Sequence, residues 1–331
     1  MKDINPTTIT NILEYEGELN LDVAFHIIYV SKIDNEPLRT SKKMKLPHQP
    51  IPGTIMSMRY KNMTRGIFRT LKNNDQFKNS ITIDISLTDK NVSLKLSKNT
   101  IHMSGVKKFE NSDEAGSLLF GKLRECQSFL DLIRANPEKM RLIAEKVKEK
   151  AKINEVYNED QETIERRIIF DPVKPKLLKK YEFPIKMFQS CGYGYRDLDL
   201  YFQRIEWLFE EKGNAIVSEP RITKVRNEMI NFNYSLGFPI IRWILKVFVN
   251  GTSGFTALFN NIYNDYVRIR FPIPGEKRKH NFSIYRSGRI TQSGKDMDEM
   301  NRILNLLYDI IEPNFDKIVK PIIMKYKPSE K

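Results

Sequence analysis

The sequence contains only two cysteines, Cys126 and Cys191, among its 331 residues. Two cysteines cannot form the cross-links of a disulfide-stabilised scaffold, which indicates a protein of a reducing compartment. No apolar run reaches the roughly 18 residues of a membrane-spanning helix, because Arg242 and Lys246 interrupt the longest one, near 238–248. The first residues show no signal-peptide core, and no lipid anchor is visible. We therefore expect a soluble, intracellular protein.

The sequence also lacks the motifs of common enzyme classes. Gly192-Tyr193-Gly194 has no third glycine and no strand–helix context for a dinucleotide-binding loop. No Cys-x-x-Cys, His-Glu-x-x-His or Gly-x-Ser-x-Gly pattern occurs, and nothing suggests a third carboxylate to join Asp197 and Asp199. The four histidines are scattered. We therefore predict a protein that is not an enzyme and that holds no metal ion and no cofactor.

Negative charge is in short supply. The chain has 41 Asp and Glu against 55 Lys and Arg, which leaves a net charge of +14. Such an excess favours polyanionic partners, either nucleic acid or an anionic membrane surface. With 40% apolar and 11% aromatic residues the chain can bury a sizeable core. Its length fits two average domains, or one symmetric domain with a large insertion.

Two segments of the chain resemble each other and indicate an internal repeat. In 99–105 and 288–294, Ile, Ser and Gly stand at matching places, and each segment follows a short extended run. Each also precedes an amphipathic helix, whose apolar residues recur at steps of three and four. These residues are Leu119, Leu123, Cys126, Leu130 and Ile133 in the first helix and Met300, Ile303, Leu304, Leu307, Ile310 and Ile311 in the second.

The starts of the two halves also correspond. Residues 6–11 lead into a strand and a helix-like stretch at 19–29, and residues 220–227 precede a similar stretch from Phe238. Between these helices, apolar and polar residues alternate, as in 81–86 and 92–96. An alternation in which every second residue is apolar gives a strand one apolar face, and it predicts a sheet that helices cover on one side only. We expect the function to lie on the open side.

The remaining residues fall outside the two repeats. We predict a first repeat at 6–133, an inter-repeat insertion at 134–216, a second repeat at 217–312 and a basic tail at 313–331. In the insertion, a charged helix at 138–152 is expected to extend the first repeat's last helix. The prolines 172, 175 and 184 predict extended chain, and a further helix is expected at 198–212.

This order of elements resembles the TATA-box-binding protein family. Ile9-Thr10-Asn11-Ile12 resembles that family's opening strand, and Phe77-Lys78-Asn79-Ser80-Ile81 resembles the strand that begins with a wedge phenylalanine. Val225-Arg226-Asn227 and Ser287-Gly288-Arg289-Ile290 resemble parts of its second repeat, and 52–66 resembles an insertion of the large-DNA-virus members. The resemblance implies an α+β fold: a pseudo-symmetric two-repeat saddle with a curved antiparallel sheet, helices on its convex face and a helical insertion between the repeats.

The resemblance also implies site residues. The family reads the minor groove, whose acceptors distinguish A·T from G·C pairs, and inserts apolar wedges between base steps. Asn11 and Asn227 match the asparagines at the centre of the DNA-binding face. Phe77 and Tyr285 match wedge positions, and Tyr263 is a looser match to another.

The fourth wedge is missing, and Lys95 raises a question of strand register. A hairpin longer by one residue places Lys95 on the open face and buries Leu94 and Leu96, which avoids burying a lone ammonium. We therefore expect a polar and basic open face suited to phosphate contacts. Its expected members besides the residues already named are Lys95, His102, Ser104, Arg268, Arg270, Arg289, Thr291 and Ser293.

These observations predict a transcription-initiation factor that binds promoter duplex DNA. The alternatives are a non-specific nucleic-acid-binding protein for packaging or repair, and an enzyme or partner-binding protein on the same fold. The first function implies other initiation factors and RNA polymerase as partners of a monomer with internal symmetry. It also implies a site of viral transcription, in a host cytoplasmic factory, the nucleus or the virion.

Overall fold

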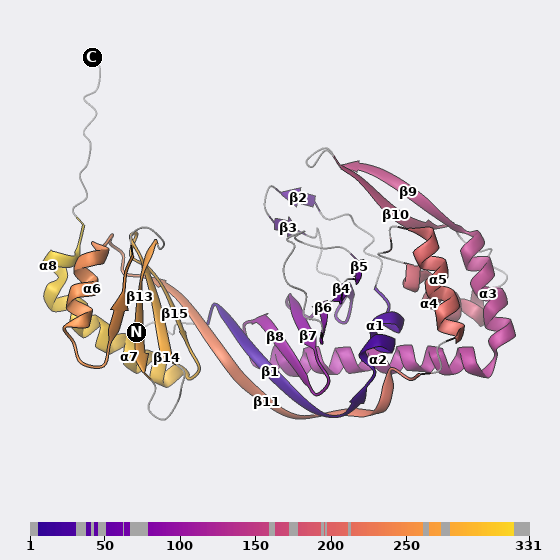
Figure 1. The fold of residues 1–331 in the computed structure, drawn as a ribbon, viewed down its shortest axis with the longest axis horizontal. Coiled ribbons are helices and arrows are strands. Elements are labelled where there is room, and N and C mark those ends of the chain that lie inside the picture. Colours follow the sequence, from indigo (N-terminus) through magenta and orange to yellow (C-terminus); the bar gives the residue numbers. More distant parts are fainter. Residues whose placement is uncertain are drawn as a thin grey trace, which may run out of the picture. The chain divides into compact units, whose positions relative to one another are not determined.

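The computed structural model describes residues 6–30, 38–40, 43–45, 51–61, 63–66, 79–158, 163–171, 178–192, 195, 197–210, 213–260, 265–272 and 279–320 (Figure 1). The chain divides into two compact units. The first-repeat unit is Asn11–Arg226, and the second-repeat unit is Asn227–Lys331 together with the residues up to Thr10. The insertion predicted at 134–216 thus belongs to the same unit as the first repeat.

The fold is α+β, as the resemblance implied, and each unit contains hydrogen-bonded antiparallel strands. In the first-repeat unit the strand order is β11-β1-β8-β7-β6-β4-β5, and in the second-repeat unit it is β12-β13-β14-β15-β11-β1. The two long strands, β1 and β11, belong in part to each unit. The strands are β1 (Thr8–Leu19), β4 (Ile55–Tyr60), β5 (Met63–Gly66), β6 (Ile81–Ser86), β7 (Asn91–Leu96), β8 (Thr100–Val106), β11 (Ile216–Ser235), β12 (Thr256–Leu258), β13 (Tyr266–Pro272), β14 (Lys279–Tyr285) and β15 (Arg289–Gly294).

The first-repeat unit covers one face of its strands with α1 (Leu21–Ile27) and α2 (Glu110–Ala135). The predicted apolar stripe of α2 is buried throughout, from Leu119 to Ile133. Leu94 and Leu96 are also fully buried, whereas Lys95 is not, so the register with the longer hairpin is confirmed. The segment 52–66 forms β4 and β5, which pair with each other, and β4 also pairs with β6. A short separate ladder joins β2 (Leu38–Thr40) and β3 (Lys43–Lys45).

The described residues of the insertion add helices and a β-hairpin to this unit. These elements are α3 (Pro137–Glu149), β9 (Ala151–Asn158), β10 (Thr163–Phe170), α4 (Leu178–Gly192) and α5 (Leu198–Glu210). The helices pack on α2 and on one another, for example through the rings of Phe129 and Phe188, whose centroids are 5.0 Å apart.

Two predictions for the insertion were wrong. The helix at 138–152 does not continue α2, because Pro137 cannot donate a backbone hydrogen bond and forces Asn136 out of helical geometry (φ −144°, ψ 59°). Pro184 lies inside α4 and not in extended chain, because the buried residues Phe188 and Cys191 hold that helix against its neighbours. The helix expected at 198–212 is confirmed as α5. Residues 172–177, with the other two prolines, lie outside the described chain.

The second-repeat unit packs α6 (Arg242–Asn250) and α7 (Met297–Ile311) on one face of β12–β15 (Figure 1). Its core joins strand residues such as Val267 and Phe282 to the predicted apolar stripe of α7. The Asp296 side chain caps α7 by accepting a 2.8 Å bond from the Glu299 amide. The fold continues past 312 into α8 (Phe315–Ile318), whose Ile318 is fully buried, so part of the predicted tail belongs to the core.

Candidate nucleic-acid interface

The uncovered face of the second repeat is built by alternation along its strands. On β13, β14 and β15 every second side chain points away from α6 and α7. These outward side chains lie opposite one another on neighbouring strands and so form rows across the sheet. Arg268 pairs with Ser283, which pairs with Thr291, which in turn pairs with Asn233 of β11. A second row aligns Arg270, Asn281, Ser293 and Asn231 in the same way.

Hydrogen bonds fix the polar side chains at the centre of this face. Thr291 Oγ1 donates to Asn233 Oδ1 at 2.7 Å, and Ser293 Oγ donates to Asn231 Oδ1 at 2.6 Å. Asn231 Nδ2 donates to Thr8 Oγ1 at 3.1 Å, which links β11 to β1. Within the described chain the Nδ2 donor of Asn233 has no partner, and this side chain is exposed. The arrangement presents an oriented amide donor to a ligand above the sheet.

One end of the same face carries aromatic rings and guanidinium groups. The rings of Tyr266 and Tyr285 lie 5.4 Å apart between centroids. The Arg289 guanidinium is 4.3 Å from the centre of the Tyr285 ring, and Arg268 donates a 2.9 Å bond to the Tyr266 hydroxyl. Rings held in this way can stack on bases while the cations reach phosphates.

Six of the eight residues predicted for the second repeat lie together on this face, and the other two are Asn227 and the tyrosine at 263. The six are Arg268, Arg270, Tyr285, Arg289, Thr291 and Ser293. In the described chain, the positions of β11–β15 that share this face carry no Asp or Glu. The face is thus cationic without internal neutralisation.

The first-repeat face has the same construction and a different charge. Lys95 and His102 are paired across β7 and β8, and Ser104 stands on the same side of β8, as predicted. Partial burial lowers the pKa of the Lys95 ammonium. Asp84 lies in this face and accepts a 2.5 Å hydrogen bond from Ser57. The carboxylate offsets the lysine, so this face is less suited to polyanions than the second-repeat face.

Both predicted asparagines are corrected by the structure. Asn11 is fully buried and points to the helix side, where its Nδ2 donates a 2.6 Å bond to Ser112 of α2. A one-residue difference in strand position reverses the face of a side chain, and Asn11 falls on the same side as the buried Leu13. Asn227 is half-buried and donates its amide to the Lys295 carbonyl. Neither amide is free to meet a groove.

The wedge candidates Phe77 and Tyr263 lie outside the described residues. Sequence reasoning missed Asn231, Asn233 and Tyr266, which complete the second-repeat face. Their signal is present in the alternation of β11, where Ile230 and Phe232 are buried and the asparagines between and after them are not.

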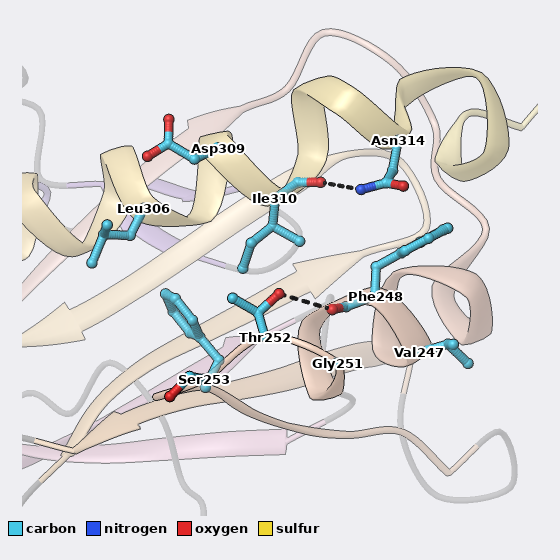
Figure 2. Close-up of a pocket in the computed structure, with 10 residues that line it drawn as sticks. Val247, Phe248, Gly251, Thr252, Ser253, Leu306, Asp309, Ile310 and Asn314 are labelled. Carbon is cyan, nitrogen blue, oxygen red and sulfur yellow. Dashed lines mark hydrogen bonds between the residues drawn. The ribbon is translucent and has the colours of Figure 1, made fainter.

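A hollow of about 570 Å³ opens between α6, the turn after it and α7 (Figure 2). Two of its polar side chains bond within the protein: Thr252 Oγ1 donates to Phe248 O at 3.2 Å and Asn314 Nδ2 donates to Ile310 O at 2.9 Å. Apolar side chains dominate the rest of its lining. It offers no constellation of catalytic groups.

The described part of the chain contains no cluster of His, Cys, Asp and Glu that could hold a metal ion. Among the same residues, no helix is long and apolar enough to cross a bilayer.

Comparison with known proteins gives one kind of match. No family model matches the chain, and no curated protein matches it. Fifteen chains of known structure match. One of them is Methanococcus jannaschii TBP, with a TM-score of 0.38 and 11% identity over 94% of this chain and 98% of that one. At this identity and score the similarity concerns the arrangement of the chain and not what it binds.

Proposed function

We propose that this protein binds double-stranded DNA through the uncovered sheet face of its second repeat, as an initiation factor of the TATA-box-binding-protein type. The observation that carries the proposal is the cationic second-repeat face. Arg268, Arg270 and Arg289 share this face with hydroxyls and amides, and no described carboxylate accompanies them. The protein acts in this proposal as a binding protein without enzymatic activity.

The arginines supply affinity. Phosphate neutralisation releases counterions and dominates protein–DNA affinity at moderate salt. Guanidinium groups on a sheet face suit the oxygens of phosphate groups, and their contacts position the protein without reading sequence. The excess of positive charge over the whole chain supports the same partner, because it raises the rate of encounter with a polyanion.

The central amides supply discrimination. The minor groove offers adenine N3 and thymine O2 as acceptors, whereas a G·C pair adds an amino donor. The outward Nδ2 of Asn233 complements the acceptors and meets the guanine amino group unfavourably. Asn231 is held in the adjoining row by its own hydrogen bonds to Thr8 and Ser293. The expected preference is for A·T-rich duplexes.

A second candidate function is non-specific binding for packaging or repair through the same face. The polar character of the face favours this function. Among the described residues, Tyr285 is the one predicted wedge on this face, and its ring already contacts Arg289 and Tyr266. In that case the arginines would contribute as above and the amides would not discriminate. The partners would then include neither RNA polymerase nor other initiation factors.

A comparison of duplexes tests the proposal and separates the two functions. The dissociation constants of A·T-rich and G·C-rich duplexes of equal length are measured with the full chain at several salt concentrations. A promoter-binding factor gives tighter binding to the A·T-rich duplex, and selection from random duplexes returns a common A·T-rich element. Equal affinities and no selected element indicate the non-specific function. No salt-dependent binding to either duplex refutes both.

For the first function, we further propose a viral chain that works beside other initiation factors and RNA polymerase at the site of viral transcription. Co-purification of polymerase subunits with the tagged chain from infected cells tests this part. A chain recovered without polymerase, yet with A·T-rich DNA, would retain the DNA-binding proposal and remove the partner proposal.

A further inference from the structure

Two arginines are buried together in the first-repeat unit, far along the chain from each other. Arg65 of β5 is fully buried. Its Nη1 donates two 2.7 Å hydrogen bonds, to the carbonyl oxygens of Phe25 and Ile28 at the end of α1. Its Nε and Nη2 are enclosed and have no hydrogen-bond partner in the described chain. The Nη1 group of Arg65 is therefore hydrogen-bonded within the fold, whereas its Nε and Nη2 groups are not.

Arg204 of α5 has even fewer partners. The residue is 3% exposed, and none of its Nε, Nη1 and Nη2 atoms has a hydrogen-bond partner in the described chain. A guanidinium carries five N–H donors, so all five of Arg204 are unsatisfied. Arg65 lies 5.8 Å from the centre of the Phe25 ring, which is 5.4 Å from the ring of His26. The His26 ring is in turn 4.5 Å from the ring of Trp207, over which Arg204 lies. The two cations thus share one enclosed environment.

No described carboxylate neutralises this pair. Neither arginine takes part in a salt bridge with a described Asp or Glu, and Asp22 of α1 is bound to Lys61 at 2.6 Å. Both cations instead lie over aromatic rings, Arg204 over Trp207 at 4.8 Å and Arg65 over Tyr195 at 5.6 Å. His26, whose ring is 4.5 Å from that of Trp207, adds a buried Nδ1 atom that has no partner either.

Aromatic contacts do not replace a counter-charge. A cation–π contact stabilises the positive charge. It leaves unsatisfied the N–H donors, which lie in the plane of the guanidinium group. Burial of an unpaired ion is among the most unfavourable events in folding, and proteins pair such ions or let them bind an anion. Two neighbouring guanidiniums with unused donors therefore lack a negatively charged partner.

We propose that Arg65 and Arg204 hold a small oxyanion of the phosphate class between them, with His26 at the edge of the site. The unused donors are arranged in two planar forks, which suit the paired oxygens of such an anion. Because the donor atoms are enclosed, their partner would be a free inorganic anion and not a polynucleotide backbone. The anion would join β5 and the end of α1 to α5, and so fasten the insertion to the first repeat.

A unit-resolved thermal experiment tests this site. The chain has two tryptophans, Trp207 in the first-repeat unit and Trp243 in the second-repeat unit. In a Trp243→Phe background the fluorescence reports on the first-repeat unit alone. Unfolding is followed in inorganic phosphate, in sulfate and in chloride at one ionic strength. We expect phosphate and sulfate to raise the midpoint saturably and chloride to leave it unchanged, as mass action on a native-state ligand requires.

Matched variants separate the buried site from the basic surface. Arg204→Met keeps the length of the side chain and removes the charge, and it should weaken phosphate binding by about tenfold or more. Arg141→Met, whose side chain is 53% exposed on α3, removes a surface arginine and should leave the phosphate effect intact. Arg204→Lys keeps the charge without the fork and should weaken the effect less than Arg204→Met.

Equilibrium dialysis of radiolabelled phosphate against the unmodified chain gives a readout that needs no variant. One equivalent retained at moderate salt supports the site. No retained phosphate, or an equal rise in midpoint for Arg204→Met and the parent, overturns it. The proposal is also overturned if phosphate does not change the unfolding midpoint of the parent and Arg204→Met unfolds at a higher temperature than the parent. That result would mean that the two arginines have no counter-charge, or that an acidic residue of the chain itself supplies it.

Discussion

The hydroxyl of Thr291 donates a 2.7 Å hydrogen bond to the Oδ1 of Asn233 across the β15–β11 ladder. This bond commits the Asn233 oxygen to the protein and directs the amide nitrogen outward from the sheet. A pair of strand residues far apart in the sequence thereby sets the polarity of the atom that a ligand would meet.

The first prediction concerns this amide. Asn233→Ala should reduce the ratio of affinities for A·T-rich over G·C-rich duplexes by about fivefold, the equivalent of one lost hydrogen bond. The charge of the face is unchanged, so the salt dependence of binding should stay the same. Asn305→Ala, an exposed asparagine on α7, is the matched control. An unchanged ratio of affinities in Asn233→Ala would show that Asn233 does not discriminate between A·T and G·C pairs.

The second prediction concerns the arginines of β13. Arg268→Ala or Arg270→Ala should weaken binding to all duplexes alike, because phosphate contacts carry no sequence information. Each lost contact should reduce the magnitude of the slope of log K against log salt by about 0.9. Arg302→Ala on α7, which is exposed and pairs with Glu299, should change neither quantity. If the β13 variants behave like this control, the interface does not lie on the second-repeat face.

The third prediction concerns Asn11, whose expected place in the groove the structure replaces with a place in the core. Asn11→Ala removes the buried bond to Ser112 and should lower the free energy of unfolding of the first-repeat unit by about 1–3 kcal/mol. DNA affinity at temperatures well below unfolding should not change. Urea unfolding followed by Trp207 fluorescence in the Trp243→Phe background measures the loss.

Ser112→Ala removes the same bond from the other side and completes a double-mutant cycle. A coupling free energy near zero would show that the bond contributes nothing to stability. A loss of A·T preference in Asn11→Ala, with stability unchanged, would restore the groove assignment.

The sequence was sufficient for the features that repeat over several residues. Alternation located β6 and β7, and steps of three and four located the buried stripes of α2 and α7. The place of Lys95 followed from a physical argument, the unfavourable burial of an ammonium between Leu94 and Leu96. Such features depend on local patterns that many residues support together.

The remaining features depend on single positions or on distant contacts. The face of Asn11 changes with a shift of one residue, and no local pattern marks that shift. Pro184 reads as a helix breaker, yet α4 contains it because tertiary packing overrides propensity. Arg65 and Arg204 are polar residues 139 positions apart in the chain, and nothing near either one predicts their shared burial.

The last prediction concerns pH and His26. Burial, followed by the charges of Arg204, Arg65 and Lys61, lowers the pKa of His26 to about 3 in the folded protein. An unfolded histidine has a pKa of about 6.5. Between these values the unfolded chain binds a proton that the folded chain does not, so stability must fall as the pH is lowered from about 6.5 towards 3. Above that window His26 contributes no pH dependence.

His26→Phe should remove this dependence while it keeps the ring that packs against Trp207. Between about pH 6.5 and 5, above the range where most carboxylates titrate, the parent should lose up to about 1.4 kcal/mol of stability per pH unit relative to the variant. The measurement is urea unfolding of the Trp243→Phe background in chloride buffers. His102→Gln, which removes an exposed imidazole of the first-repeat face, is the control. Parallel stability profiles for His26→Phe and its parent would mean that the folded imidazole titrates as it does in the unfolded chain, and that Arg65 and Arg204 do not impose their charge on it.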